Sequence, residues 1–239
     1  MTEPSAGVDM HRRVVVPVLV ALTVVTGLVD AVSFLGLGQV FVAVMTGNVV
    51  FLGLGLAGAP DTPVLEPLCA LAAFALGAAG GGRAITRWAG HRGRVLLVAI
   101  VLELVLVLGA AVIALAELHL TSRAAALAVV GLMACGLAVQ NTVVRHLAVR
   151  DFTTTLLTLT LTGMVADSHP AGGSGGHVLR RGTSVLALFA GALVGGLFVV
   201  RAGVGPPLLL VAAMLVVVLG VLGRSLRRSA AADWEAPTV

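Results

Sequence analysis

Isolated polar residues lie within long apolar stretches of this sequence. Asp30 interrupts the first apolar run, Met-Thr-Gly-Asn follows at 45–48, and a second Thr-Gly pair occupies 162–163. A buried carboxylate can hold a cation or a proton, and hydroxyl and amide groups can replace part of a solute's water shell. Glycine permits backbone conformations closed to other residues. These residue types predict a path for a small solute or ion.

Asp30 has two compatible interpretations. It lies about 24 Å along a helix that begins near Val14, where an ionised carboxylate is costly unless it is paired or hydrated. It can be a cation or proton site that faces a central cavity. It can equally cap free amides of a broken segment near 45–48, because a helix N-terminus favours an anion.

The second half offers weaker counterparts of these groups. Thr155, Thr158 and Thr162 are spaced three and four apart and share one helical face, which suggests a wetted lining. A threonine in a membrane helix is also often bonded to a carbonyl of its own helix. Gln140 and Asn141 correspond to Asp30, although an interhelical polar clamp explains them at least as well.

The predicted pathway combines these groups from both halves. Side chains at 46 and 48 can line it, or they can satisfy backbone groups freed where the helix breaks. Glu103, about 12 Å into its segment, is a secondary candidate that can pair with an arginine, relay a proton or reach interfacial water. The pathway residues are Asp30, Ser33, Thr46, Gly47, Asn48, Gln140, Asn141, Thr158, Thr162 and Gly163.

The composition of the chain indicates that these residues lie on membrane helices. Of 239 residues, 59% are hydrophobic and 11% charged, against about 25% charged in ordinary soluble domains. Every basic residue is arginine, mostly in short clusters between apolar runs, which indicates membrane topology and no nucleic-acid partner. A soluble enzyme is therefore excluded.

No motif for catalysis, a cofactor or a metal is present. The sequence lacks GxSxG, HExxH, P-loop and dinucleotide patterns, so we expect no enzyme and no cofactor. Cys69 and Cys135 lie in separate apolar segments, which supports neither a disulfide nor a zinc site. His169 and His177 lie in a glycine-rich loop that is typical of a solvated linker.

Eight apolar segments are long enough to lie within a bilayer. Eight full crossings divide the arginines almost equally, whereas a dip of the second and sixth segments leaves thirteen on one side and two, Arg123 and Arg201, on the other. The positive-inside rule favours six crossings and two re-entrant or broken segments, with both termini in the cytoplasm. Both dips should then lie at the centre of the bundle and meet there. The segments are about 14–36, 40–58, 64–82, 95–116, 123–144, 152–166, 184–200 and 206–223.

A weak internal repeat divides the membrane region into two halves. The Thr-Gly pairs recur at an offset of 116 residues and two GxxxG pairs, which begin at Gly77 and Gly191, at 114. Three crossings per half give the halves opposite orientations, as in many transporters. We expect an all-α polytopic protein with a 3+3 inverted repeat: a tail at 1–13, one membrane domain at 14–223 with repeats 14–116 and 123–223, and a tail at 224–239. Glycine-rich helix faces indicate a homo-oligomer.

Several of these residues also resemble those of a known family. Asp30 to Leu35, Phe41 to Asn48, Gln140-Asn141 and Thr162-Gly163 are similar to the YoaK-like bacterial integral membrane proteins. The resemblance spans 14–223 and implies a multi-pass fold in the bacterial plasma membrane, but no substrate. Met164 departs from the polar residue that often follows the second Thr-Gly.

These observations support one leading function and two alternatives. The leading prediction is a transporter or channel for a small solute in the plasma membrane, surrounded by lipid. The second is a structural or signalling membrane protein whose polar core only specifies packing. The third is an intramembrane enzyme that acts on lipid, for which Asp30 and Glu103 would have to act together across helices.

Overall fold

A computed structural model describes residues 6–87, 92–117, 122–146, 157–167, 172 and 178–228 of the chain, and these residues form helices joined by turns and loops. Within the described ranges, six helices are long and apolar enough to cross a membrane, and the long arrays of exposed leucine, valine and phenylalanine on them contact lipid. The all-α prediction with six spans is confirmed. The helices are α1 (Ala6–Gly36), α2 (Met45–Leu56), α3 (Leu65–Arg87), α4 (Arg92–Ala116), α5 (Arg123–His146), α6 (Leu157–Ala166), α7 (Val178–Ala202) and α8 (Gly205–Arg228).

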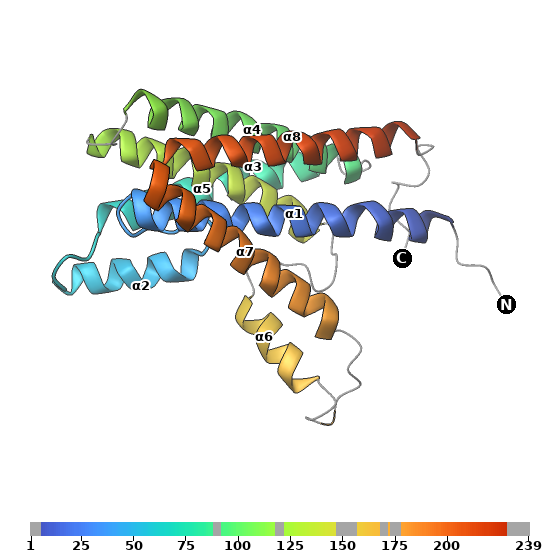
Figure 1. Cartoon of the computed structure of the whole chain (residues 1–239), viewed down its shortest axis with the longest axis horizontal. Helices are drawn as coiled ribbons and strands as arrows, with labels where there is room; N and C mark the ends of the chain where they lie inside the picture. Colours follow the sequence, from blue (N-terminus) through green and yellow to red (C-terminus); the bar gives the residue numbers. More distant parts are fainter. Residues whose placement is uncertain are drawn as a thin grey trace.

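Glycine contacts hold two parallel helix pairs together, α1 with α7 and α3 with α5 (Figure 1). A Cβ added at Gly191 of α7 would collide with the carbonyl oxygen of Val24 in α1. A Cβ added at Gly77 of α3 would collide with the carbonyl oxygen of Cys135 in α5. Close backbone approach through small residues is how membrane helices associate when apolar burial gives no advantage over lipid.

The other major contacts join α4 to α5 and α8, and α8 to α1. Helices α1 and α5 are the most enclosed of the six spans, and eleven residues of α5 are buried. Gly205 at the start of α8 lies against Leu115 near the end of α4, so these two helices are antiparallel. A core of buried leucine, valine and alanine from α1, α4, α5 and α8 results.

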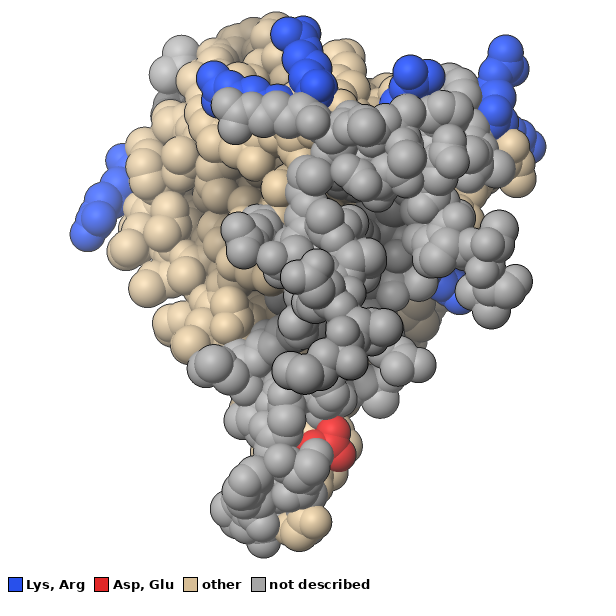
Figure 2. Space-filling model, turned by 90° about the vertical axis from the view of Figure 1, so that its right-hand side faces the viewer, with Lys and Arg blue, Asp and Glu red and all other residues tan. Residues whose placement is uncertain are grey.

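The two ends of the bundle differ in charge. Eight arginine side chains are described, and all are exposed. Six lie where α3, α5 and α8 end and α4 begins, and we call this the arginine-rich end: Arg83, Arg87, Arg94, Arg145, Arg224 and Arg227. Figure 2 views this end and shows basic side chains spread around its edge. Arg123 and Arg201 lie at the opposite, arginine-poor end, as the sequence predicts.

Helix α2 belongs to a re-entrant segment at the arginine-poor end. The end of α1 and the start of α3 are neighbours there, because a Cβ at Gly38 would lie 3.3 Å from Cγ of Glu66. Between them the chain turns away from the arginine-poor end, and α2 then runs back towards that end, where Gly55 contacts residues 62–64. The helix begins at Met45, five residues later than the segment predicted at 40–58.

The short helix α6 lies in a segment that leaves and returns at the arginine-rich end, because α5 ends and α7 begins there. Figure 1 shows α6 and the beginning of α7 extending away from the other helices. The expectation that both dips lie at the centre of the bundle and meet is wrong: α2 packs on α3 and α6 on α7. Val49 and Val50 of α2 are 58% and 60% exposed, so this helix lies at the periphery of the single chain.

Candidate functional site

Asp30 anchors the inner part of the first re-entrant segment. Its Oδ1 accepts hydrogen bonds from the backbone N–H groups of Val42 and Ala43, at 3.0 and 2.9 Å. The side chain is buried, one and a half turns from the end of α1. The carboxylate therefore caps free amides just before α2, slightly upstream of the 45–48 amides that the sequence predicts. The hydroxyl of Ser33 donates to the carbonyl of Asp30, 3.1 Å away within the same helix.

Asn48, in the first turn of α2, also holds the re-entrant segment through hydrogen bonds. Its Oδ1 accepts a hydrogen bond from the N–H of Phe41 at 2.9 Å, and its Nδ2 donates to the carbonyl of Phe41 at 2.6 Å. A side-chain amide thus replaces the backbone partner that a helix or strand would supply. Gly47 gives the ring of Phe41 its space, because a Cβ there would lie 2.7 Å from the ring. Both residues shape the turn in which Phe41 lies.

Thr46 differs from its neighbours because its side chain is exposed, in the first turn of α2. Beside this turn, three phenylalanine rings pack at centroid distances of 5.2 to 6.2 Å: Phe34, Phe41 and Phe51. The sequence reasoning missed this aromatic cluster. The signal was present in the spacing of three phenylalanines around the Met-Thr-Gly-Asn run.

A second polar cluster lies between α4 and α5. Glu103 and Gln140 are each 1% exposed. With the side-chain amide of Gln140 oriented to donate, its nitrogen lies 3.0 Å from both carboxylate oxygens of Glu103. Gln140 therefore forms an interhelical clamp, one of the two roles that the sequence allowed. Asn141, the next residue, is half-buried.

The candidate residues of α6 stand apart from both clusters. Thr158 and Thr162 are exposed, and Gly163 is partly buried. Met164 faces α7, where a Cβ at Gly182 would lie 3.8 Å from its sulfur. Thr155, His169 and His177 fall outside the described residues. The structure thus separates the α6 hydroxyls from the Asp30 segment.

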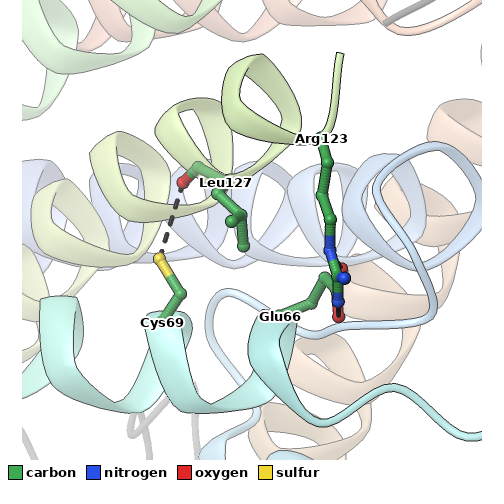
Figure 3. Close-up of polar contacts among 4 residues, drawn as sticks. All are labelled: Glu66, Cys69, Arg123 and Leu127. Atoms are coloured by element: carbon green, nitrogen blue, oxygen red, sulfur yellow. Dashed lines mark hydrogen bonds and ion pairs between the residues drawn. The ribbon is translucent and has the colours of Figure 1, made fainter. Parts of the chain in front are cut away.

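An ion pair at the arginine-poor end joins α3 to α5 and was not predicted. Nε of Arg123 lies 2.9 Å from Oε1 of Glu66, and its second nitrogen lies 3.3 Å from Oε2 (Figure 3). One turn further, Sγ of Cys69 donates to the carbonyl of Leu127 at 3.6 Å. The sequence held a signal, because Glu66 and Arg123 each lie in the first turn of a span on the same predicted side. The pair borders an open depression of about 320 Å³ lined by Gly38, Gln39, Asp61, Thr62, Pro63, Glu66 and Arg123.

Within the described part of the chain, no group of three or more histidine, cysteine, aspartate or glutamate side chains could hold a metal ion. The polar groups of the candidate site are carboxyls, amides and hydroxyls set in apolar helices. Such groups can coordinate a cation, a proton or a small polar solute.

Comparison with known proteins places the chain among membrane proteins. A segment of 56 residues is 43% identical to the UPF0700 transmembrane protein YoaK of Bacillus subtilis (strain 168), which covers 23% of this chain and 25% of YoaK. The chain therefore matches about a quarter of the length of that relative. No solved structure matches. Residues 18–222 match the model of the DUF1275 family, described as proteins of unknown function, and this chain, a multi-pass membrane protein, belongs to that family.

Proposed function

We propose that this protein is a transporter or channel for a small solute or ion in the bacterial plasma membrane. The observation that carries the proposal is the re-entrant segment held by Asp30. Non-helical backbone at membrane depth is tolerated where it is buried in protein or lines a wet cavity. Broken helices whose N-termini meet polar groups are the usual building elements of solute sites in transporters. No enzymatic step is part of the proposal.

An inverted repeat is supported by the way the helices pair. If α1 to α4 correspond to α5 to α8, the α1–α7 contact corresponds to α5–α3, α4–α5 to α8–α1, and α2–α3 to α6–α7. All of these pairs pack against each other. Every principal contact thus has a counterpart under exchange of the two halves.

The glycine contacts support the same correspondence at residue level. The carbonyl of Val24 opposes Gly191, and the carbonyl of Cys135 opposes Gly77. Matching these two contacts pairs Val24 of α1 with Cys135 of α5, an offset of 111 residues. The same offset aligns Asp30 with Asn141. A charged and a neutral polar residue therefore occupy equivalent positions in the two proposed repeats.

The proposed pathway runs beside the re-entrant turn held by Asp30, with the arginine-rich end in the cytoplasm. The positive-inside rule supports this orientation, with both termini in the cytoplasm. Thr46 is the clearest lining group, because its hydroxyl is exposed beside the re-entrant turn. A homo-oligomer is included in the proposal, since Gly53, Gly80 and Gly82 have open space where a Cβ would lie.

Flux into proteoliposomes tests the proposal. The purified protein should move at least one member of a broad panel of labelled ions, amino acids, sugars and nucleosides, and Thr46→Val should reduce that flux without lowering the melting temperature. Thr86→Val, an exposed threonine of α3 outside the proposed pathway, is the control. Asp30→Asn should remove the pH or cation dependence of the flux. Unchanged flux in Thr46→Val would exclude its lining role.

A structural or signalling role is the second candidate. It is favoured by the contacts of Asp30 and Asn48, because both side chains bond to backbone groups of the same turn. In that case, the polar residues serve to fix the fold. The absence of flux for every member of the panel, from protein shown to be folded in the liposomes, would support this function.

A further inference from the structure

The interface of α4 and α5 encloses a carboxyl group without a cationic partner. Glu103 is 1% exposed, and its described polar contact is the side-chain amide of Gln140, which is itself 1% exposed. Glu103 lies eleven residues from the start of α4, about 16 Å from the arginine-rich end. A charge held at that depth without compensation is strongly disfavoured.

The helices packed against α4 place no described charge near this carboxyl group. On α5, Gly136 touches Glu103, and the titratable residue next to Gly136 in sequence is Cys135. The charged residues of α5 lie in its end turns: Arg123, Arg145 and His146. On α8, Arg224 and Arg227 lie in the last turns, and α3 carries its charges at Glu66, Arg83 and Arg87, likewise near its ends. On α4 itself, Arg92 and Arg94 lie in the first turn and Glu117 follows the end. Among the described residues, no arginine or histidine forms an ion pair with Glu103.

Asp30 provides a contrast within the same chain. Two backbone N–H groups donate to its carboxylate, just before the N-terminus of α2. Such donors and the helix dipole stabilise the charged form. Among the described residues, no backbone N–H donates to Glu103, and its described partner is the side-chain amide of Gln140, which can present a donor or an acceptor. The two buried acids therefore belong to different electrostatic environments.

From this contrast we infer that Glu103 is a proton-binding site, in which the carboxyl group holds a proton and its O–H donates a hydrogen bond to the side-chain amide oxygen of Gln140. One terminal atom of that amide lies 3.0 Å from both carboxyl oxygens. If this atom is the amide oxygen, it accepts the O–H of the neutral acid. If it is the nitrogen, it donates to the carboxylate. The amide oxygen and nitrogen are nearly identical in shape, so each protonation state has a matching amide orientation in the same space.

The register between the halves makes this site asymmetric. Gln140 corresponds to Val29 under the offset of 111 residues, and Val29 is a buried hydrophobic residue. The proton site therefore combines Glu103 of the first half with Gln140 of the second, and no amide stands at the equivalent position of α1. It goes beyond the proposed function, since it holds a proton whether or not the protein moves a solute.

Reaction with dicyclohexylcarbodiimide tests the inference, because this apolar reagent modifies protonated carboxyl groups within membranes. The full-length protein in detergent is labelled at neutral pH, and adducts are located by mass spectrometry. We expect more adduct at Glu103 than at Asp30, by up to about tenfold for each pK unit by which their proton affinities differ. Glu66, paired with Arg123, is the internal control for an ionised acid. Equal or greater labelling of Asp30 would overturn the inference.

Infrared spectroscopy provides an independent measurement that does not depend on access of the reagent. The spectrum at neutral pH should contain the C=O band of a protonated carboxyl group that disappears in Glu103→Gln. The band should remain but shift in Gln140→Leu, because the hydrogen-bond acceptor is lost. If the spectrum of the folded protein contains no protonated-acid band that Glu103→Gln removes, Glu103 is ionised and the inference is wrong.

Discussion

The contact between Asp30 and the re-entrant turn leads to a graded prediction for the stability of two variants. Asp30→Asn keeps an oxygen that can accept from the N–H groups of Val42 and Ala43, but removes the charge. Asp30→Leu removes the acceptor as well and leaves two buried N–H groups without a partner. Both variants should be less stable than the wild type, and Asp30→Leu should be the less stable of the two.

The size of each effect follows from the two hydrogen bonds. A hydrogen bond to a charged group contributes about 1.5–3 kcal/mol and one between neutral groups about 0.5–1.5 kcal/mol, so Asp30→Asn should lose about 2 kcal/mol over both bonds. Two unsatisfied buried donors cost about 2–6 kcal/mol in Asp30→Leu. In a chain of this size, about 2 kcal/mol corresponds to a melting temperature lower by about 4–8 °C.

Thermal unfolding in detergent, followed by circular dichroism or by the reactivity of the two partly buried cysteines, measures these shifts. Asp61→Asn is the matched control, because this carboxylate is exposed and its loss should change stability by no more than about 0.5 kcal/mol. Equal melting temperatures for the wild type and Asp30→Leu would refute the reasoning. The carboxylate would then not hold the turn.

Three further predictions concern packing, the ion pair and topology. Gly191→Ala should destabilise the protein by about 1–3 kcal/mol because its Cβ meets backbone of α1, whereas Gly80→Ala, with open space, should be neutral or stabilising in the same melting assay; equal effects would contradict the packing. Arg123→Gln should lower stability by less than about 1 kcal/mol, because the arginine side chain is 64% exposed; a larger loss would assign the pair a structural role. Single cysteines at Thr62 and Gly172, in a background without the two native cysteines, should be labelled by an impermeant reagent from opposite sides of the membrane, and labelling from one side only would exclude the re-entrant topology.

The spans and the charge asymmetry could be predicted from sequence because they depend on one-dimensional quantities. The six long helices match the predicted crossings, with ends that differ by up to eight residues. Arg123 and Arg201 lie at the arginine-poor end, as the positive-inside rule requires. The re-entrant course of the first dip followed from the same counting of arginines. Its anchor at Asp30 followed from the cost of a buried carboxylate.

The sequence could not predict in the same way which helices lie beside one another in the membrane. Apolar faces directed to lipid and to protein have similar composition, so the sequence did not place α2 at the periphery or separate it from α6. The partner of Asn48 depends on a turn whose path no periodicity reveals, because Phe41 lies seven residues away on non-helical backbone. The ion pair of Glu66 and Arg123 spans 57 residues and required knowledge of which helices are neighbours.

The parallel packing of α1 on α7 has a consequence for biogenesis. Helix α1 leaves the ribosome before the other helices described, yet its glycine-lined partner is synthesised about 150 residues later, after α3 has already been able to join α5. During this interval the face of α1 with Val24, Gly27 and Leu28 is incomplete and must be shielded by lipid, by the insertion machinery or by a chaperone. Premature termination before α7 should therefore leave a nascent chain that quality-control proteases recognise through α1, and neither half is expected to mature without the other.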